Sequence, residues 1–171
     1  MVKILIIGAH SLMSIGMHAM AISTMTALKK SIPDVEFTIL SVCPEIEHNL
    51  YDKYHFNLRV IKYDESLLKL KLIFRMLREY GRADIIIGMY GDALIDITIG
   101  SAILYSGSTL LASILRRPFV LYPQSIGPFK TKLTLFLTKF ALNRATSITA
   151  REKITKNYLR DIGVNKPPIY L

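Results

Sequence analysis

Short apolar runs alternate with amphipathic stretches along the whole chain. Residues 2–7, 36–41, 58–61, 84–88, 119–122, 147–149 and 169–171 form runs with the length and composition of β-strands. Helical periodicity occupies residues 16–31, 66–80, 97–115, 129–144 and 151–162, whereas residues 42–54 are less regular. Strands that alternate with helices indicate crossover units, so we expect an α/β fold with a doubly wound parallel sheet.

Two of the expected helices carry a marked apolar stripe. In the helix at 66–80 the stripe consists of Leu70, Ile73, Leu77 and Tyr80, and in the helix at 129–144 it consists of Leu133, Phe136, Leu137 and Phe140. Side chains at this spacing lie on one side of a helix. We therefore expect both stripes to face the sheet.

The segment 97–115 has two interpretations. It carries no charge and is followed by Arg116 and Arg117, so by length it could just span a bilayer. It also contains two glycines and six hydroxyl residues, which is typical of a helix packed between a sheet and other helices. Because predicted strands stand on either side of it, we favour the buried helix.

The composition adds a basic charge balance to this picture. The 171 residues are 51% hydrophobic and 20% charged, which indicates a globular chain of about one domain. The net charge is +9, which suits anionic small molecules, an anionic polymer or the cytoplasmic face of a membrane, although solvated surface lysines explain it equally well. The single cysteine, Cys43, excludes an internal disulfide and is typical of a reducing compartment.

In a parallel sheet, ligands bind beyond the carboxyl ends of the strands. The loops at those ends provide the candidate binding residues: Gly8, Ser14, Gly16 and His18 after the first strand, Gly91 and Asp92 after the fourth, Gln124, Ser125 and Gly127 after the fifth, and Arg151 after the sixth. We predict that Gly16, Asp92, Gln124 and Arg151 line one edge of a cleft.

The first loop matches no standard nucleotide motif. Gly8 and Gly16 are eight residues apart, so it is neither a dinucleotide fingerprint nor a P-loop. Gly16 could admit an anion to a helix N-terminus or serve only as a turn residue. His10 and His18 lack companions at metal-ligand spacing, so we predict no metal site.

The loops after the fourth and sixth strands contain acidic residues with separate roles. Asp96 is expected to cap the helix that follows it, which leaves Asp92 as the candidate contact for a hydroxyl-bearing ligand. Thr149 and Glu152 have the spacing of a capping box. Arg151 opposes the dipole of that helix, so we expect it to have an anionic partner, from either the protein or a substrate.

The stretch "YPQSIGPFK" follows the fifth strand. Pro128 is expected in the first turn of the next helix, and Gly127 allows the bend before it. Gln124 and Ser125 should then lie at the edge of the sheet with their polar groups available. Turn chemistry explains the glycine and the proline but not the glutamine.

Three segments resemble the polysaccharide pyruvyl transferase family. "VLYPQSIGPFK" is similar to a Gly-Gln-Gly-Ile-Gly-Pro-like turn, "ITAREKITKNYLRDIGV" to an Arg-Asp/Glu-x-x-Ser-like helix start, and "IIIGMYGDALID" to a Gly-Gly-Gly-Asp-like segment. "FTILSVCPEIE" and the first loop also fit. The chain departs from the family in Pro123, in Thr155, and after the first strand, where an acidic pair common in the family is missing.

The resemblance implies a Rossmann-like N-terminal half of a GT-B-like enzyme with two domains, with residues 1–171 as one domain and a C-terminal partner domain outside this chain. Family members transfer a pyruvyl group from phosphoenolpyruvate to a saccharide hydroxyl in cell-surface polysaccharide biosynthesis. Asp92 and Gln124 would contact sugar hydroxyls, Asp92 is the candidate catalytic residue, and the donor's anionic groups would require cations largely from the second half.

The implied partners are phosphoenolpyruvate as donor substrate and a saccharide acceptor, either free or lipid-linked. We expect no further cofactor and no nucleic acid. The expected location is cytoplasmic, with a peripheral contact at the inner face of the membrane left open. Two other functions also remain open: half of a GT-B nucleotide-sugar glycosyltransferase, or a non-catalytic module that binds a sugar or a nucleotide.

Overall fold

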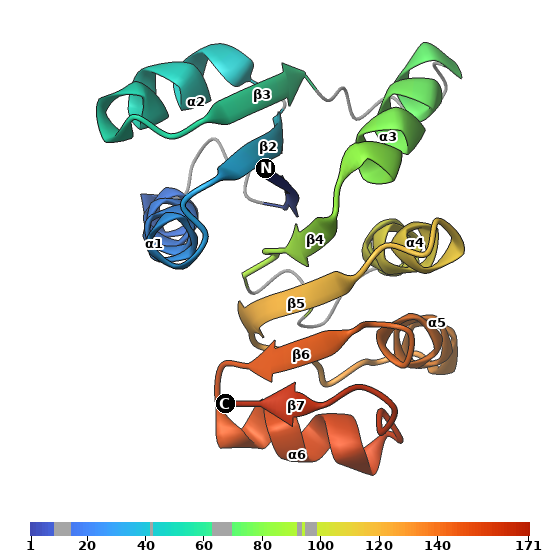
Figure 1. Cartoon of the computed structure of the whole chain (residues 1–171). Helices are drawn as coiled ribbons and strands as arrows, with labels where there is room; N and C mark the ends of the chain where they lie inside the picture. The colour runs from blue at the N-terminus through green and yellow to red at the C-terminus, as the bar shows by residue number, and fades with distance from the viewer. Residues whose placement is uncertain (9–14, 42, 63–69, 92–93, 95–98) are drawn as a thin grey trace. The chain divides into compact units, whose positions relative to one another are not determined.

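We describe the fold from a computed structural model (Figure 1). The structure describes residues 1–8, 15–41, 43–62, 70–91, 94 and 99–171. The chain divides into two compact units, Met1–Ile86 and Ile87–Leu171. That residues 1–171 form one domain stays a prediction.

The first unit is built on three parallel strands, β1 (Val2–Ile7), β2 (Val35–Ser41) and β3 (Leu58–Lys62). Ile4 pairs with Phe37, which pairs in turn with Leu58. Residues 4–7 of β1 are all buried, as expected for a strand covered on both faces. The helices are α1 (Ile15–Ser31), α2 (Pro44–Tyr51), the short 3-10 helix η1 (Asp52–Tyr54) and α3 (Leu70–Arg82).

The second unit contains the parallel strands β5 (Phe119–Gln124), β6 (Ser147–Ala150) and β7 (Ile169–Tyr170). Leu121 pairs with Ile148, which pairs with Ile169, and the register shifts between Leu121 and Gln124. The helices are α4 (Ile99–Ile114), α5 (Lys132–Leu142) and α6 (Lys153–Asp161), and α4 packs beside α5 (Figure 1). The strand β4 (Ile85–Gly88) spans the boundary between the units.

The strand order is β3-β2-β1-β4-β5-β6-β7, and the described pairings are parallel. The chain therefore runs outward from β1 to β3 and then, from β4 onward, in the opposite direction through the sheet. This reversal is the defining feature of a doubly wound sheet. The predicted α/β, doubly wound, Rossmann-like fold is confirmed.

The less regular stretch after β2 contains a helix that the sequence pattern did not predict. Pro44 stands at the start of α2, where its missing N–H is not needed. Glu45 and Glu47 lie in the first turn, where their negative charges interact favourably with the positive end of the helix dipole. These residues are typical of a helix start, but the apolar residues of this stretch have no regular helical spacing, so the helix was not predicted.

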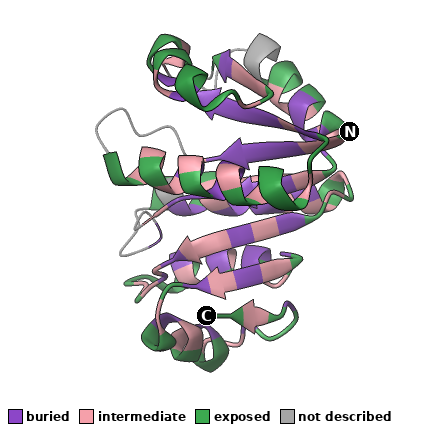
Figure 2. Cartoon of the chain, turned by 60° about the vertical axis from the view of Figure 1, so that its left-hand side comes forward, coloured by how far each residue is buried: buried purple, intermediate pink, exposed green. Residues whose placement is uncertain are grey.

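The inward face predicted for the helix at 129–144 is wrong. Leu133, Phe136 and Phe140 are exposed, whereas Thr134, Thr138 and Ala141 are buried. Figure 2 shows that the strands are mostly buried or intermediate, whereas the helices also carry exposed residues. Close packing against α4 explains the reversal, because only small side chains let two helices approach so closely. Ile73 of α3 is likewise 42% exposed, contrary to prediction, although Tyr80 is buried as predicted.

The uncharged segment forms α4, which is buried on only one face. Its buried residues are small, with Ala102, Ser106, Thr109 and Ala112 on the inner side, whereas Ile103 and Ile114 are exposed. Within the described ranges, no helix has both the length and the apolar character that crossing a membrane requires. The favoured packed helix is thus correct for one face of α4, and its outer face is apolar and exposed.

Candidate functional site

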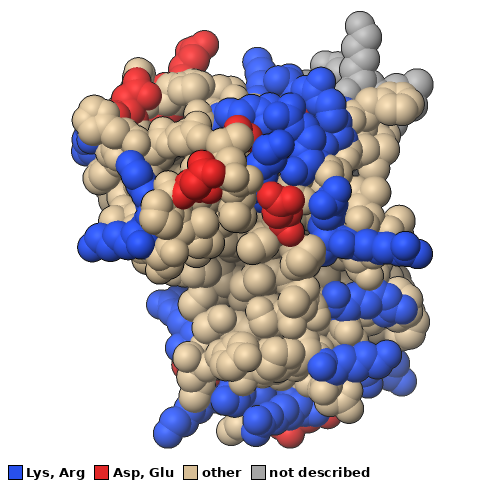
Figure 3. All heavy atoms as spheres, in the orientation of Figure 1, with Lys and Arg blue, Asp and Glu red and all other residues tan. Residues whose placement is uncertain are grey.

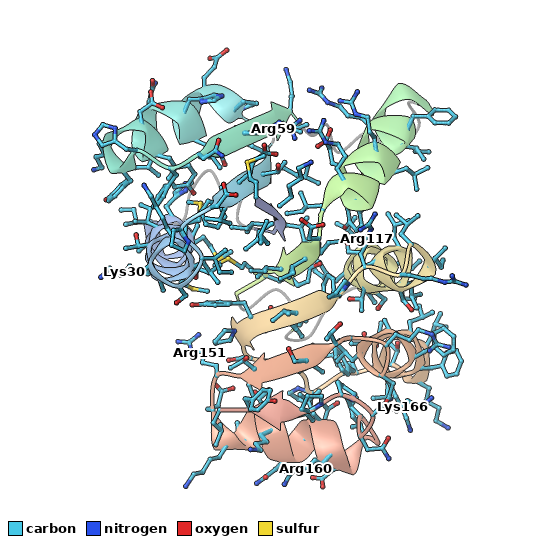
Figure 4. All side chains as sticks on the ribbon, in the orientation of Figure 1. Lys30, Arg59, Arg117, Arg151, Arg160 and Lys166 are labelled. Carbon is cyan, nitrogen blue, oxygen red and sulfur yellow. The ribbon has the colours of Figure 1, made fainter. Side chains whose placement is uncertain are left out.

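The stretch that follows β5 has its backbone held by neighbouring segments on both sides. Arg151 N–H donates to the carbonyl of Gln124 at 3.2 Å, just beyond β6. Gly127 N–H donates to the carbonyl of Leu94 at 2.9 Å, and Leu94 forms a parallel bridge with Ile126. The turn is therefore fixed at the carboxyl ends of β5 and β6, and Arg151 stands at these ends in Figure 4.

Gln124 is the least conventional residue of this turn. Its side chain is buried, and Oε1 accepts from the backbone N–H of Tyr90 at 3.2 Å. Within the described part of the chain, Nε2 has no hydrogen-bond partner. The amide was predicted to be available at the sheet edge. Instead, its carbonyl is used internally and its NH2 group is a buried, unsatisfied donor.

Ser125 is held by a carboxylate of α6, contrary to the prediction that its hydroxyl is available. Ser125 Oγ donates to Glu152 Oε2 at 3.2 Å, and Thr155 Oγ1 donates to the other oxygen of Glu152. Thr155 Oγ1 in turn accepts from the backbone N–H of Ile126 at 3.4 Å. The Glu152 carboxylate thus joins the turn to the helix that follows β6.

This arrangement corrects the predicted capping box. Thr149 still lies within β6, and Glu152 occupies the N-cap position of α6 rather than the third helical position. Because the Glu152 carboxylate binds two hydroxyls, its role is to hold the turn. Sequence reasoning missed this role for Glu152 and Thr155, although the Arg-Glu-x-x-Thr spacing was the available signal.

Gly127 is required by both conformation and space. Its φ is +74°, and a Cβ there would lie 2.1 Å from Cε1 of Tyr158. Tyr158 OH accepts from the backbone N–H of Phe129 at 3.1 Å, so the tyrosine supports the turn. Pro128 does not begin the next helix as predicted. Thr131 caps α5 instead, accepting from Thr134 N–H at 3.1 Å.

The glycine-containing segment after β4 is only partly described. Gly88 packs tightly against β5, because a Cβ there would lie 2.8 Å from Cζ of Phe119. Gly91 has a positive φ of 61° and follows Tyr90, whose N–H binds Gln124. Asp92 and Asp96 lie outside the described residues, so the roles assigned to them stay predictions.

The candidates of the first unit lie around the start of α1. Gly8 directly follows β1, and Gly16 is exposed in the first turn of α1. His18 Nδ1 lies 3.0 Å from the hydroxyl of Tyr51, a residue of α2. Ser14 and His10 lie outside the described residues. His18 therefore has an internal partner, and its predicted contact with a substrate stays a prediction.

His18 belongs to a buried polar group that sequence reasoning missed. Ser41, Glu47 and Tyr51 are all buried; Ser41 Oγ donates to the Glu47 carboxylate and accepts from Cys43 N–H at 2.9 Å. Burial, reinforced by the Glu47 charge, raises the pKa of Tyr51. Ser41, at the carboxyl end of β2, is thus hydrogen-bonded to Glu47 of α2.

The structure brings together part of the predicted site. Gln124, Ser125, Gly127 and Arg151 share one end of β5 and β6 in the second unit, next to Tyr90 and Gly91. The cleft edge that was predicted to join them with Asp92 and Gly16 stays a prediction. Among the described residues of the second unit, the Gln124 amide is a buried donor, and Arg151 is bound to the same residue through the backbone.

The crystal structure of Anabaena Alr3699/HepE in complex with UDP-glucose has the same fold, with a TM-score of 0.65 at 16% sequence identity. The likeness covers 99% of this chain but 44% of the HepE chain. Among curated proteins, none matches this chain.

Comparison with protein-family models assigns the chain to a family, whereas the structural likeness shows only the fold. The model of polysaccharide pyruvyl transferases matches residues 15–171, a range that includes α1, the turn after β5 and the Arg-Glu-x-x-Thr segment that holds it. The match thus extends over the same motifs whose contacts build the carboxyl end of β5 and β6. The chain belongs to the polysaccharide pyruvyl transferase family.

Proposed function

We propose that this chain forms the acceptor-side, N-terminal half of an enzyme that transfers a pyruvyl group from phosphoenolpyruvate to saccharide hydroxyls. Family membership supports a transferase acting on polysaccharide. The observation that carries the proposal is the buried NH2 group of Gln124. Leaving such a donor unsatisfied costs about 1–3 kcal/mol, which a ligand oxygen at this position would recover.

The position of Gln124 suits a ligand. It ends a strand of a doubly wound sheet, where ligands bind beyond the carboxyl ends. Its other amide atom is fixed by Tyr90 N–H, so the NH2 group has a defined direction before any ligand arrives. A fixed donor loses little entropy on binding, which favours recognition of a saccharide hydroxyl or of an anionic oxygen.

The proposed reaction makes defined demands on the site. An acid protonates the methylene carbon of phosphoenolpyruvate, two saccharide hydroxyl oxygens bond to the neighbouring carbon, and inorganic phosphate leaves with the C–O electron pair. One hydroxyl proton replaces the proton given to the methylene, and the other ends on phosphate or solvent. Arg151, at the end of β6, would offset negative charge on the donor, and Asp92 is our candidate base.

A two-domain architecture completes this proposal. The likeness to HepE extends over 44% of that longer chain, which supports a half-site assembled with a further domain. A donor that carries both carboxylate and phosphate needs several cations together, and a second wall would exclude water from the reacting carbon.

Recognition of a nucleotide sugar is the second candidate function. It is favoured by the HepE structure, which contains UDP-glucose. The Gln124 donor and the Arg151 charge would also suit a ribose or diphosphate oxygen. In this case the chain should bind UDP-glucose more tightly than phosphoenolpyruvate, which calorimetry with each ligand alone would show.

The test of the main proposal is a matched pair of substitutions in a two-domain family member that carries this N-terminal half. Gln124→Glu keeps an acceptor for Tyr90 N–H and removes the NH2 group, whereas Gln124→Met removes both. We expect each to lower kcat/KM for ketal formation about 10- to 100-fold, with a folded protein in the Glu variant. Unchanged phosphate release from phosphoenolpyruvate by the Glu variant would refute a role for the amide donor.

A further inference from the structure

The outer face of α5 combines exposed aromatic rings with cations. Phe136 and Phe140 are 61% and 42% exposed, and their rings stack with centroids 6.0 Å apart. Leu133, one turn before Phe136, is 50% exposed. A helix that buries threonines and exposes phenylalanines gives up the stabilisation that burial of large apolar side chains would provide. This arrangement points to a surface that is covered by something else.

A groove runs along this face, between α5 and the segment before β7. It has a volume of about 410 Å³, and its walls include Phe136, Phe140 and Asn165. Lys139, Arg144 and Lys166 also line it, and Figure 4 shows Lys166 beside the end of α5. The Arg144 guanidinium lies 3.5 Å from the centre of the Phe140 ring, and its Nη1 donates to the Phe140 carbonyl at 2.7 Å.

The position of the Lys139 side chain depends on a glycine in the neighbouring segment. Gly163 has φ +84°, and a Cβ there would lie 2.6 Å from Lys139 Nζ, so the lysine crosses the groove over a residue without a side chain. Within the described part of the chain, no carboxylate lines the groove. The groove therefore presents cationic groups above an aromatic wall.

The net positive charge of the chain comes from the part of the sequence that contains α5. Residues 1–98 contain 11 Lys and Arg against 11 Asp and Glu, whereas residues 99–171 contain 11 against 2. The entire excess of +9 thus belongs to the segment from α4 to β7. In Figure 3, Lys and Arg side chains stand along the side of the second unit where α5 lies in Figure 1.

We propose that the α5 groove, defined by Phe136, Lys139, Phe140, Arg144 and Lys166, docks on the surface of a bilayer that contains anionic phospholipids. Phe136 and Phe140 would enter the boundary between headgroups and acyl chains, where aromatic rings are favoured. Lys139, Arg144 and Lys166 would contact headgroup phosphates, because the negative potential of such a surface attracts cationic side chains. This docking is independent of the reaction proposed above.

Charge complementarity favours a bilayer over a second copy of the chain. In a two-fold dimer through this face, the three cations would meet the same three cations, which is repulsive. An anionic lipid surface instead supplies many phosphates around an apolar interior, and so matches both the cations and the rings.

The experiment is flotation of the chain with vesicles of phosphatidylcholine alone or mixed with phosphatidylglycerol. We expect binding to the mixed vesicles, little binding to phosphatidylcholine, and release as NaCl rises from about 50 mM to about 500 mM. Lys139→Glu should weaken binding at least about five-fold, as should the double change Phe136→Ser and Phe140→Ser.

Matched controls lie elsewhere on the surface. Ile154→Ser removes a 75% exposed apolar side chain from α6, and Lys30→Glu reverses an exposed charge at the end of α1; neither should change binding. Circular dichroism establishes that each variant is folded, and the salt series on the unsubstituted chain provides a readout that no variant can compromise.

Three outcomes would overturn the proposal. One is equal binding to neutral and anionic vesicles. Another is release by inorganic phosphate but not by chloride of the same ionic strength, which would assign the groove to a free anion. The last is a dimer in light scattering that the phenylalanine variant dissociates, which would assign the face to a protein interface.

Discussion

Ser125 Oγ donates a hydrogen bond to Glu152 Oε2 at 3.2 Å, across 27 residues of sequence. This bond joins the turn after β5 to the N-terminus of α6. The second oxygen of the same carboxylate accepts from Thr155, and Thr155 supports the backbone of Ile126. Two family motifs that are separate in sequence therefore form one structural element.

Removal of the Glu152 carboxylate should destabilise the second unit. In Glu152→Ala, the hydroxyls of Ser125 and Thr155 lose their acceptor, and we expect a loss of about 1–3 kcal/mol in the free energy of unfolding, measured in urea. Lys153→Ala, at the adjacent exposed position, is the control and should change stability by less than about 0.5 kcal/mol. Equal stability of the two variants would contradict this role of Glu152.

Two glycines should respond to alanine in opposite directions. Gly127→Ala would place a Cβ 2.1 Å from the Tyr158 ring at φ +74°, so we expect a loss of at least about 2 kcal/mol or failure to fold. Gly107, in the middle of α4, has open space around it, and Gly107→Ala should raise stability by about 0.5–1 kcal/mol. Thermal unfolding of both variants checks this difference in sign.

Tyr51, a buried residue of the first unit, should impose an alkaline limit on stability. Burial, with the Glu47 charge, raises the pKa of Tyr51 above its usual value of about 10. As pH rises through about 10, the unfolded chain releases the Tyr51 proton while the folded chain retains it, so stability falls.

Tyr51→Phe should remove this alkaline loss. The variant should be less stable than the original at about pH 8, by about 0.5–1.5 kcal/mol, because the contact with His18 is lost. The difference should shrink as pH rises toward about 11. Tyr54→Phe, at an exposed ring, is the control, and a Tyr51→Phe profile parallel to that of the original would refute the assignment.

A small cavity between α4, α5 and β5 allows the cost of a buried hydroxyl without a hydrogen-bond partner to be measured. It measures about 10 Å³ and is lined by Ser106 and Thr138, whose hydroxyls are buried and have no partner among the described residues. Thr138→Val replaces the hydroxyl with a methyl group, so we expect stability to rise by about 1 kcal/mol. A comparable loss would instead indicate that a water molecule bridges the two hydroxyls.

The isolated chain should not transfer pyruvate. Phosphate release and ketal formation from phosphoenolpyruvate and a saccharide can be followed by colorimetry and mass spectrometry. A two-domain member of the family should form both products, and the 171-residue chain neither, because the carboxylate and phosphate of the donor need cations that the proposed second half would supply. Ketal formed by this chain alone would contradict the half-site model.

The sequence alone determined the alternation of strands and helices, apart from α2, and the parallel α/β fold. Apolar runs such as 84–88 and amphipathic stretches such as 151–162 differ in period, and this local signal does not depend on what packs against the segment. It also located Gln124, Gly127 and Arg151 at strand ends, because strand ends follow from strand positions. The motifs of the turn and of α6 were visible, but their mutual contact was not.

Tertiary structure decided which groups are used and which faces are covered. The partner of Gln124 Oε1 lies 34 residues away, and that of Ser125 lies 27 away, distances over which periodicity carries no information. In α5, the stripe of Thr134, Thr138 and Ala141 has the same helical spacing as the stripe of large apolar residues. Close approach to α4 selected the small side chains for burial, and the phenylalanines were left on the surface because there was no room for them between the helices.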